Sequence, residues 1–283
     1  LLFKKTKPTL SKGQLGFALK YCIPIIPHGL SQVLLSQSDR IMIQKIIGNA
    51  EAGIYSFSYN IATILQIIAT SLDTVWGPWF FEQYKEKKIE DIKRRSSQYV
   101  LIFSIITVGI IALSPEIIFI MASKEYWESI HSVIPVVLSV YFIFLYYLPA
   151  QIEYYEKKTV NIALGTIYAA ILNIILNYLL IPKYGYIAAA YTTLFSYVCY
   201  LLFHLVKAKK IARKLPFASK QIIIQVMIVC IGSFFIYFSL GSFIIRLVML
   251  FAIFVLLLFS DKSSMKEVIK IIKNVLKCSF SEG

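Results

Sequence analysis

Long apolar runs, separated by short polar segments, dominate the hydrophobic pattern of this chain. Each run is close to the roughly 20 residues that a helix needs to cross the hydrocarbon of a bilayer. Because a segment in lipid must satisfy its own backbone hydrogen bonds, the pattern predicts helices rather than strands. The eight predicted membrane helices cover residues 15–38, 53–70, 100–122, 130–150, 160–181, 185–206, 217–240 and 243–260.

The clearest boundary between two runs lies in the stretch LNYLLIPKYGYIAAAYTTL, residues 176–194. Pro182 and Gly185 are predicted to end one helix and to start the next at the extracytoplasmic surface. Tyr178, Tyr184 and Tyr186 flank this turn, where amphipathic rings prefer to sit in a membrane. The stretch therefore predicts two helices that turn at the membrane surface.

Composition supports an all-α integral membrane protein. The hydrophobic fraction is 58%, charged residues make up 16%, and the mean hydropathy is +0.71. A chain of 283 residues in water has no use for that much apolar surface. The stretch LLFKKTKPTLSKG at the start is typical of a helix end and a basic linker, so we expect the C-terminal part of a longer protein.

Polar content divides the chain into four predicted regions. Residues 1–12 form a cytoplasmic linker, and residues 13–207 form a six-helix transporter lobe whose helices carry polar stripes. Residues 208–260 form an appended hairpin, because its two helices lack such stripes. In residues 261–283, apolar side chains alternate with lysines at helical spacing. This pattern predicts a basic amphipathic tail helix on the inner leaflet, or alternatively a solvated helix.

The net charge of +14 is explained by membrane topology. Most Lys and Arg residues fall into the N-terminal linker, the tail, and every second connection between the predicted helices, notably residues 85–95 and 207–220. Cationic residues accumulate in cytoplasmic loops, so both ends of the chain are predicted to be cytoplasmic. Nucleic-acid binding is not needed to explain the charge.

Motifs of soluble enzymes and metal proteins are missing from the sequence. It contains no GxSxG, HExxH, Walker loop or GxGxxG, and no cluster of His and carboxylates at metal-ligand spacing. The four cysteines form no CxxC pair. We therefore expect no catalytic residue, no metal and no cofactor.

Candidate binding residues follow from polar stripes on the predicted helices. Such groups need partners inside a membrane protein, so the stripes should point inward. They serve either interhelical hydrogen bonding or a hydrated cavity, and both uses remain open. The stripe residues selected as candidates are His28, Gln32, Asn60, Gln66, Asn173 and Asn177.

Three charged residues complete the candidate site. Asp39 and Arg40 lie near the outer end of the first helix, and Lys45 follows about a turn and a half later. Adjacent helical residues do not face each other, so Asp39 and Arg40 need different partners. Arg40 and Lys45 either reach an anionic group of a substrate or extend to the outer surface.

Three stretches resemble a known family: IPIIPHGLSQVLLSQSDRIMI, GNAEAGIYSFSYNIATILQ followed by WGPWFFEQY, and LNYLLIPKYGYIAAAYTTLFSY. They resemble the C-terminal portion of Wzx-type polysaccharide flippases. These belong to the exporter superfamily that also contains MATE drug exporters and lipid II flippases. The resemblance covers nearly all of residues 13–206. Members of this superfamily look like two six-helix lobes around a central cavity, often with an extra hairpin. This chain would supply the second lobe.

The resemblance implies a flippase in the bacterial cytoplasmic, or inner, membrane. It would move an undecaprenyl-pyrophosphate-linked oligosaccharide from the inner to the outer leaflet by alternating access. Arg40 and Lys45 would contact the pyrophosphate or an acidic sugar, and Asp39 would be their partner or an ion-coupling group. Membrane lipids, a polysaccharide polymerase and other assembly proteins are the expected partners. The alternatives are a MATE-like cation-coupled exporter of small molecules and a membrane-embedded polysaccharide polymerase.

Overall fold

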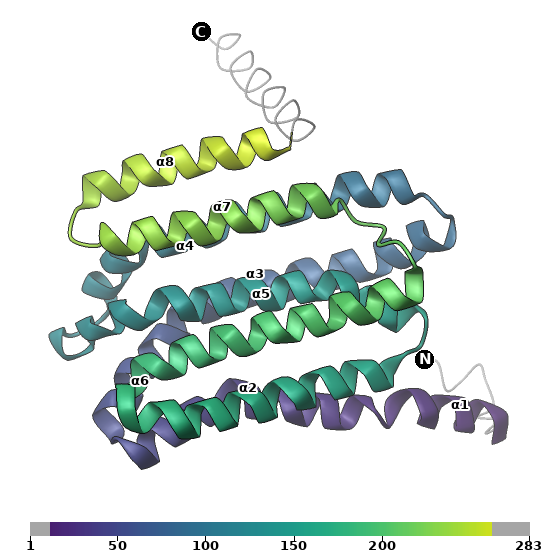
Figure 1. The fold of residues 1–283 in the computed structure, drawn as a ribbon, viewed down its shortest axis with the longest axis horizontal. Helices are drawn as coiled ribbons and strands as arrows, with labels where there is room; N and C mark the ends of the chain where they lie inside the picture. Colours follow the sequence, from purple (N-terminus) through teal and green to yellow (C-terminus); the bar gives the residue numbers. More distant parts are fainter. Residues whose placement is uncertain (1–11, 262–283) are drawn as a thin grey trace, which may run out of the picture.

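The computed structural model describes residues 12–261, and these residues form helices and short connections without a strand. The predicted tail helix and most of the predicted linker lie outside the described residues. The helices run roughly parallel or antiparallel in one bundle (Figure 1). They are α1 (Lys12–Cys22), α2 (Ile25–Ile46), α3 (Asn49–Lys85), α4 (Ile89–Met121), the short 3₁₀ helix η2 (Lys124–Ser129), α5 (Ile130–Tyr155), α6 (Thr159–Ala212), α7 (Ser219–Phe238) and α8 (Phe243–Ser260).

Prolines act differently in the first and second predicted helices. The helix expected over residues 15–38 is broken before Pro24, and α2 continues beyond residue 38 to Ile46. The helix predicted over residues 53–70 is longer than expected, and Pro78 does not break it. The α3 helix passes through Pro78 and ends at Lys85. Asp39 and Arg40 therefore lie well inside α2 rather than at its end.

The predicted turn at residues 181–185 is confirmed. Gly185 has φ 71° and ψ −163°, which is incompatible with a continuous helix and suits a residue without Cβ. The two halves of α6 lie antiparallel on either side of this bend (Figure 1). Side chains hydrogen-bond across the hairpin, for example Asn173 to Thr193 and Thr166 to Tyr200.

Six of the helices in the described part of the chain are long and apolar enough to span a membrane, which is the composition of a multi-pass membrane protein. One of them is α6, which comprises two antiparallel segments. The α2 helix, with 22 residues, is not among the six, because polar side chains dilute its apolar surface. The six spans give seven segments when α6 is divided at its bend, and α2 is the eighth. This matches the eight segments that the sequence predicted.

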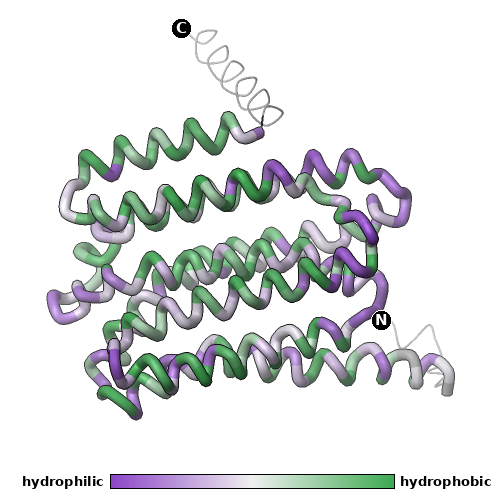
Figure 2. The backbone as a smooth tube through the Cα atoms, viewed as in Figure 1, coloured by the Kyte–Doolittle hydropathy of each residue, from purple (hydrophilic) through white to green (hydrophobic). Residues whose placement is uncertain are grey.

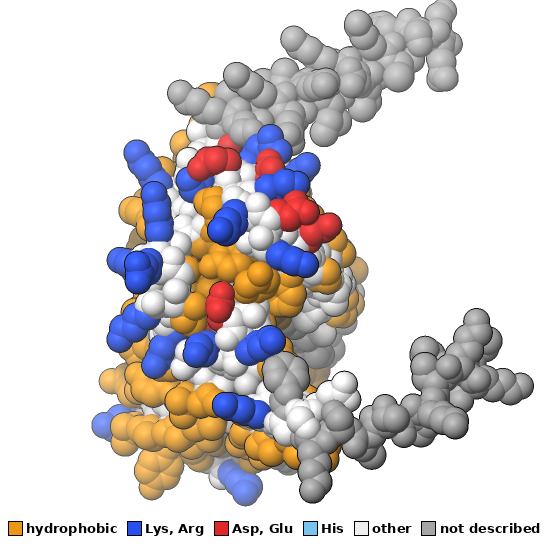
Figure 3. All heavy atoms as spheres, turned by 90° about the vertical axis from the view of Figure 1, so that its right-hand side faces the viewer, with side chains coloured by type: hydrophobic (Ala, Val, Ile, Leu, Met, Phe, Trp, Pro, Cys, Tyr) orange, Lys and Arg blue, Asp and Glu red, His pale blue; other side chains and the backbone are white. Residues whose placement is uncertain are grey.

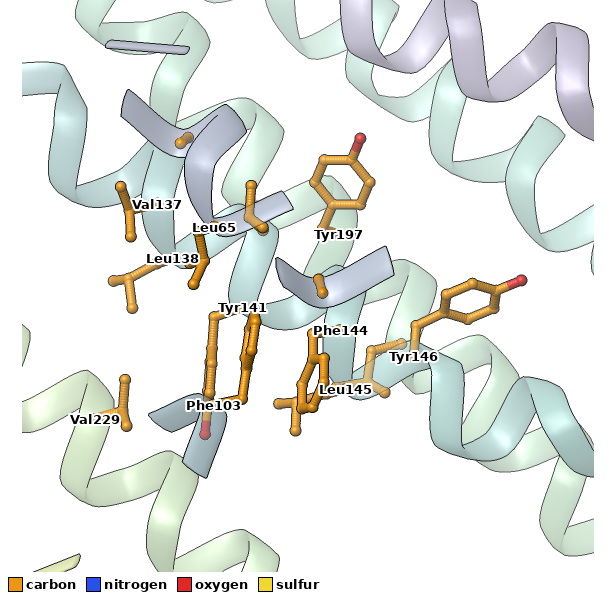
Figure 4. Packing of buried hydrophobic residues seen from close by; sticks show 14 of the residues in the cluster. Leu65, Phe103, Val137, Leu138, Tyr141, Phe144, Leu145, Tyr146, Tyr197 and Val229 are labelled. Atoms are coloured by element: carbon orange, nitrogen blue, oxygen red, sulfur yellow. The ribbon is translucent and has the colours of Figure 1, made fainter. Parts of the chain in front are cut away.

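The core of the bundle is built around α5, the most buried of the spans. It packs against α3, α4 and α6. The rings of Phe103 on α4 and Phe144 on α5 stack with their centroids 3.7 Å apart, and Tyr141 lies alongside (Figure 4). The buried Ser104 hydroxyl bonds to the Tyr141 hydroxyl at 2.8 Å, which satisfies both groups away from water.

The hairpin of α7 and α8 packs against α4. Its outer surface is strongly apolar, as Figure 2 shows by the green colour along α8. Arg246 of α8 is nonetheless buried and pairs with Glu116 of α4, and it also donates to the carbonyl oxygens of Ala112 and Leu240. Neither residue was a predicted candidate, and this ion pair was not predicted from the sequence.

One end of the bundle is rich in Lys and Arg (Figure 3). The α3–α4, α5–α6 and α6–α7 connections all lie there, because successive long helices alternate in direction (Figure 1). Acidic residues near the α3–α4 connection pair locally with the lysines and arginines, as in the Lys93–Glu90 and Arg94–Asp91 bridges. We call this the basic end.

Candidate functional site

A groove lies between α2 and α3, with α5 as its floor. Its cavity measures about 410 Å³. The residues that line it include polar side chains from all three helices, among them Gln32, Arg40, Thr63, Gln66 and Tyr147. Arg40 is the only charged residue of this lining, and the lining includes no carboxylate.

Arg40 is held at the groove by an aromatic ring. Its guanidinium carbon lies 4.5 Å from the centre of the Tyr59 ring, which is a cation–π distance. Nη1 donates to the Gln37 side-chain oxygen at 3.4 Å, a long hydrogen bond. Nε is buried without a hydrogen-bond partner among the described residues. The guanidinium thus keeps donors available for an anionic group in the groove.

Asp39 points away from the groove into the lobe, and it is fully buried. Oδ2 accepts hydrogen bonds from the hydroxyls of Tyr55 at 2.7 Å, Tyr59 at 3.0 Å and Thr193 at 2.8 Å. Oδ1 accepts from Asn177 Nδ2 at 3.3 Å. No lysine or arginine lies within ion-pair distance of this carboxylate in the described structure. Ser38 Oγ also donates to Oδ1, at 3.4 Å. Five neutral donors from α2, α3 and both halves of α6 therefore stabilise one buried acid.

Asn173 and Asn177 extend this cluster along α6. They lie one turn apart, and Asn177 Nδ2 donates to Asn173 Oδ1 at 3.1 Å. Asn173 Nδ2 donates to Thr193 Oγ1 at 3.0 Å, and Asn177 Oδ1 accepts from Thr192. Ser38 of α2 donates to Asn173 Oδ1 at 3.2 Å. We call these residues, with Asp39, Tyr55 and Tyr59, the Asp39 cluster.

His28 and Gln32 belong to a second polar contact between α2 and α6. His28 Nδ1 lies 2.6 Å from Thr166 Oγ1, and this hydroxyl lies 3.0 Å from the Tyr200 hydroxyl. Gln32 Nε2 reaches the same Tyr200 hydroxyl at 3.5 Å, and Gln32 also lines the groove. The α2–α6 interface is therefore polar over several turns.

The structure thus separates the nine predicted candidates. Asp39, Asn173 and Asn177 meet in one buried cluster, and Gln32, Arg40 and Gln66 meet at the groove, where Gln66 donates to Tyr147 at 3.3 Å. His28 lies outside the groove lining, against Thr166. Lys45 and Asn60 are exposed and line neither place, so their role stays a prediction.

Five residues of the Asp39 cluster were missed as candidates: Ser38, Tyr55, Tyr59, Thr192 and Thr193. In a chain with 19 tyrosines, Tyr55 and Tyr59 count as apolar or interfacial residues. Their spacing of four residues, which puts both hydroxyls on one helical face, was the available signal. Among the described residues, no group of three His, Cys, Asp or Glu side chains could hold a metal ion.

Comparison with known proteins confirms the predicted resemblance. The sequence model of a family described as "Polysaccharide biosynthesis protein" matches residues 2–84, which include α2, α3 and Asp39. The chain resembles the Wzx-type flippases. A protein of the Lsg locus of Haemophilus influenzae is 31% identical over 75 residues, which are 26% of this chain and 19% of that protein.

Two solved structures share the fold. One is the lipid II flippase MurJ in an inward closed conformation, with a TM-score of 0.62 and 18% identity over 94% of this chain and 58% of that chain. The other is an outward-facing multidrug resistance MATE family transporter of the MOP superfamily. It has a TM-score of 0.55 and 20% identity over 79% of this chain and 52% of that chain. The chain therefore has a MATE-like fold and spans little more than half of either transporter.

Proposed function

We propose that this chain forms the C-terminal lobe of a flippase for an undecaprenyl-pyrophosphate-linked oligosaccharide. The complete protein would carry the lipid from the inner to the outer leaflet of the bacterial cytoplasmic membrane by alternating access. The observation that supports this most directly is the groove, where one guanidinium and several polar groups line an intramembrane surface. Arginine inside a membrane span is costly and marks substrate pathways.

The charge of the groove favours an anionic substrate. Arg40 can bind a phosphate in a bidentate manner, and the surrounding Gln32, Gln66 and Tyr147 can hydrogen-bond to sugar hydroxyls. An exporter of organic cations would need carboxylates at this surface. The buried Asp39 accepts five hydrogen bonds from neutral groups and is not part of the groove lining.

We assign a coupling role to the Asp39 cluster. It joins α2, α3 and both halves of α6 through one carboxylate, so a cation that binds among its oxygens would change the contacts of all four segments together. The cluster also borders the groove, because Tyr59 bonds Asp39 and lies under Arg40. The Tyr59 side chain would then take part in both ion binding and substrate binding.

The orientation of the chain in the membrane follows from the position of the basic end. Cationic residues accumulate on the cytoplasmic side of membrane proteins, so we place the connection around Arg94 and Arg95 in the cytoplasm. The start of α1 and the end of α8 lie toward the same side (Figure 1). Both ends of the chain would then be cytoplasmic. A polysaccharide polymerase and other assembly proteins would act on the exported lipid.

The test uses the full-length gene in its host. Deletion should abolish surface polysaccharide and cause lipid-linked repeat units to accumulate in the inner leaflet, and the Arg40→Ala variant should reproduce much of this effect. The matched control is Lys183→Ala, which removes a cation from the turn at the end of the first half of α6, away from the groove lining. Surface polysaccharide that persists in the deletion strain would contradict the proposed function. Normal transport by Arg40→Ala would contradict only the assigned site.

A further inference from the structure

A second acidic group is buried in the lobe, remote from the Asp39 cluster. Glu153 of α5 and His204 of α6 are both fully buried, and Glu153 Oε1 lies 2.6 Å from His204 Nδ1. The outer atoms of the pair, Glu153 Oε2 and His204 Nε2, are buried and have no hydrogen-bond partner in the described part of the chain. Each of these two atoms can accept a proton.

The surroundings of the pair are aromatic and tightly packed. The rings of Tyr146 and Tyr200 each lie with their centroids 4.7 Å from that of His204. The His204 ring also fits against Gly165, where an added Cβ atom would overlap Nε2. The absence of a side chain at residue 165 therefore makes the room that the imidazole occupies.

No lysine or arginine forms an ion pair with Glu153 in the described structure. The nearby titratable groups are Tyr146 and Tyr154 on α5, Tyr200 on the second half of α6 and His28 on α2. Lys157 and Lys158 follow in the turn after α5. Among the described residues, His204 is therefore the basic side chain that directly contacts the Glu153 carboxylate.

The pair lies close to the basic end of the lobe. Glu153 is two residues before the end of α5, and its carbonyl oxygen accepts a hydrogen bond from the Lys158 amide in the following turn at 2.7 Å. His204 lies eight residues before the end of α6. Glu156, which is exposed just after α5, follows Glu153 by three residues, or about one helical turn, so a proton from this end has a short route to the pair.

We propose that Glu153 and His204 form a proton-binding site between α5 and α6. A proton from water on the basic side binds at Nε2 of the neutral imidazole, while Nδ1–H donates to the Glu153 carboxylate. The product is a buried imidazolium–carboxylate ion pair, and release of the same proton restores the neutral ring. Because the ion pair needs the two helices in contact, proton binding favours the arrangement in which α5 and α6 are closed at this end.

This inference does not depend on which substrate the protein carries, so its first test avoids transport. The chain has three histidines, which makes ¹⁵N-histidine spectra assignable by single substitutions. The purified protein in lipid nanodiscs would be titrated between about pH 5 and pH 8, the range in which histidine changes charge, with the shift of each ring nitrogen followed. We expect His204 to change protonation state in this window. In Glu153→Gln it should stay neutral, because a buried imidazolium would lack its anion.

The exposed His131 is the internal control, and it should titrate identically in both proteins. A His204 ring that keeps one protonation state in the native protein would overturn the proposal. A ring that titrates identically in Glu153→Gln would overturn it as well.

The second test rests on the proposed function and uses the full-length protein. If it flips lipid-linked oligosaccharide in vesicles, the pH dependence of the rate should be lost in His204→Gln and kept in His131→Gln. A rate profile that His204→Gln leaves unchanged would show that the site plays no part in transport. Failure of the native protein to transport would count against the proposed function, while the nitrogen shifts still decide the proton site.

Discussion

Replacement of Asp39 by asparagine tests how the lobe is held together. The carboxylate accepts hydrogen bonds from Tyr55, Tyr59 and Thr193 at Oδ2, and from Asn177 and Ser38 at Oδ1. An amide offers one oxygen with two lone pairs, and its NH₂ group would face a donor. With the amide oxygen at the Oδ2 position, Asn177 and one of the three donors at this oxygen lose their acceptor, whereas the Ser38 hydroxyl can still donate to Asn173 Oδ1.

The expected loss of stability follows from these two lost hydrogen bonds. A buried donor that is left unsatisfied costs about 1–3 kcal/mol, so Asp39→Asn should lower the free energy of unfolding by about 2–6 kcal/mol. This is more than the total of about 1 kcal/mol for two average interhelical hydrogen bonds in a membrane, because these donors are left buried without an acceptor. The matched control is Asp73→Asn on α3. Asp73 Oδ1 accepts from Gln151 at 2.9 Å, and an amide oxygen can accept the same bond.

The assay is unfolding of the purified protein by SDS in mixed micelles, followed by tryptophan fluorescence. We expect a large shift of the midpoint for Asp39→Asn and a change below about 1 kcal/mol for Asp73→Asn. If the two variants lose equal stability, or if Asp39→Asn unfolds like the native protein, the hydrogen bonds to Asp39 do not stabilise the lobe as described.

Two further substitutions test packing at other places. In thermal unfolding, Gly165→Ala should destabilise the protein by about 1–3 kcal/mol, because its Cβ would overlap His204 and Phe203. The control is Gly109→Ala, whose Cβ would have no atom within 4 Å. It should be neutral or stabilising by about 0.5–1 kcal/mol. Glu116→Ala should loosen the α7–α8 hairpin more than Arg246→Met does, because Arg246 is 3% exposed and Glu116 is 32% exposed. The first change leaves a buried charge unpaired, at a cost toward the roughly 3–5 kcal/mol typical of such a loss. The rate of limited proteolysis in the 213–218 connection would measure how far each variant loosens the hairpin. Faster cleavage of Arg246→Met than of Glu116→Ala would contradict this role of the ion pair.

The sequence predicted those parts of the fold that depend on local properties. Residues 176–194 predicted the hairpin, because the backbone conformations of Pro182 and Gly185 depend on these residues themselves and little on their surroundings. Spacing along single helices also identified Asp39, Asn173 and Asn177, which the structure joins in one cluster. A polar group inside an apolar span needs a partner, so these residues had to point inward.

The partners themselves could not be predicted, because they depend on how helices are aligned with one another. Periodicity shows which face of α6 is polar, but not that Thr193 meets an acid 154 residues earlier. His204 was not among the predicted candidates, yet the packing of α5 and α6 buries it against Glu153. Arg246 was not a candidate either, and only the packing of α8 on α4 encloses it.

Accessibility of the groove tests most directly whether the polar surface of α2 and α3 lines a hydrated path. In the full-length protein with its native cysteines replaced, Thr63→Cys would be compared with Val248→Cys. Thr63 lines the groove, and Val248 is an exposed residue of the apolar α8. We predict that a charged, membrane-impermeant maleimide labels the Thr63→Cys variant in vesicles and leaves the Val248→Cys variant unreacted. Equal labelling of the two variants, or a thiol at position 63 that resists the reagent from both sides of the membrane, would contradict the hydrated path.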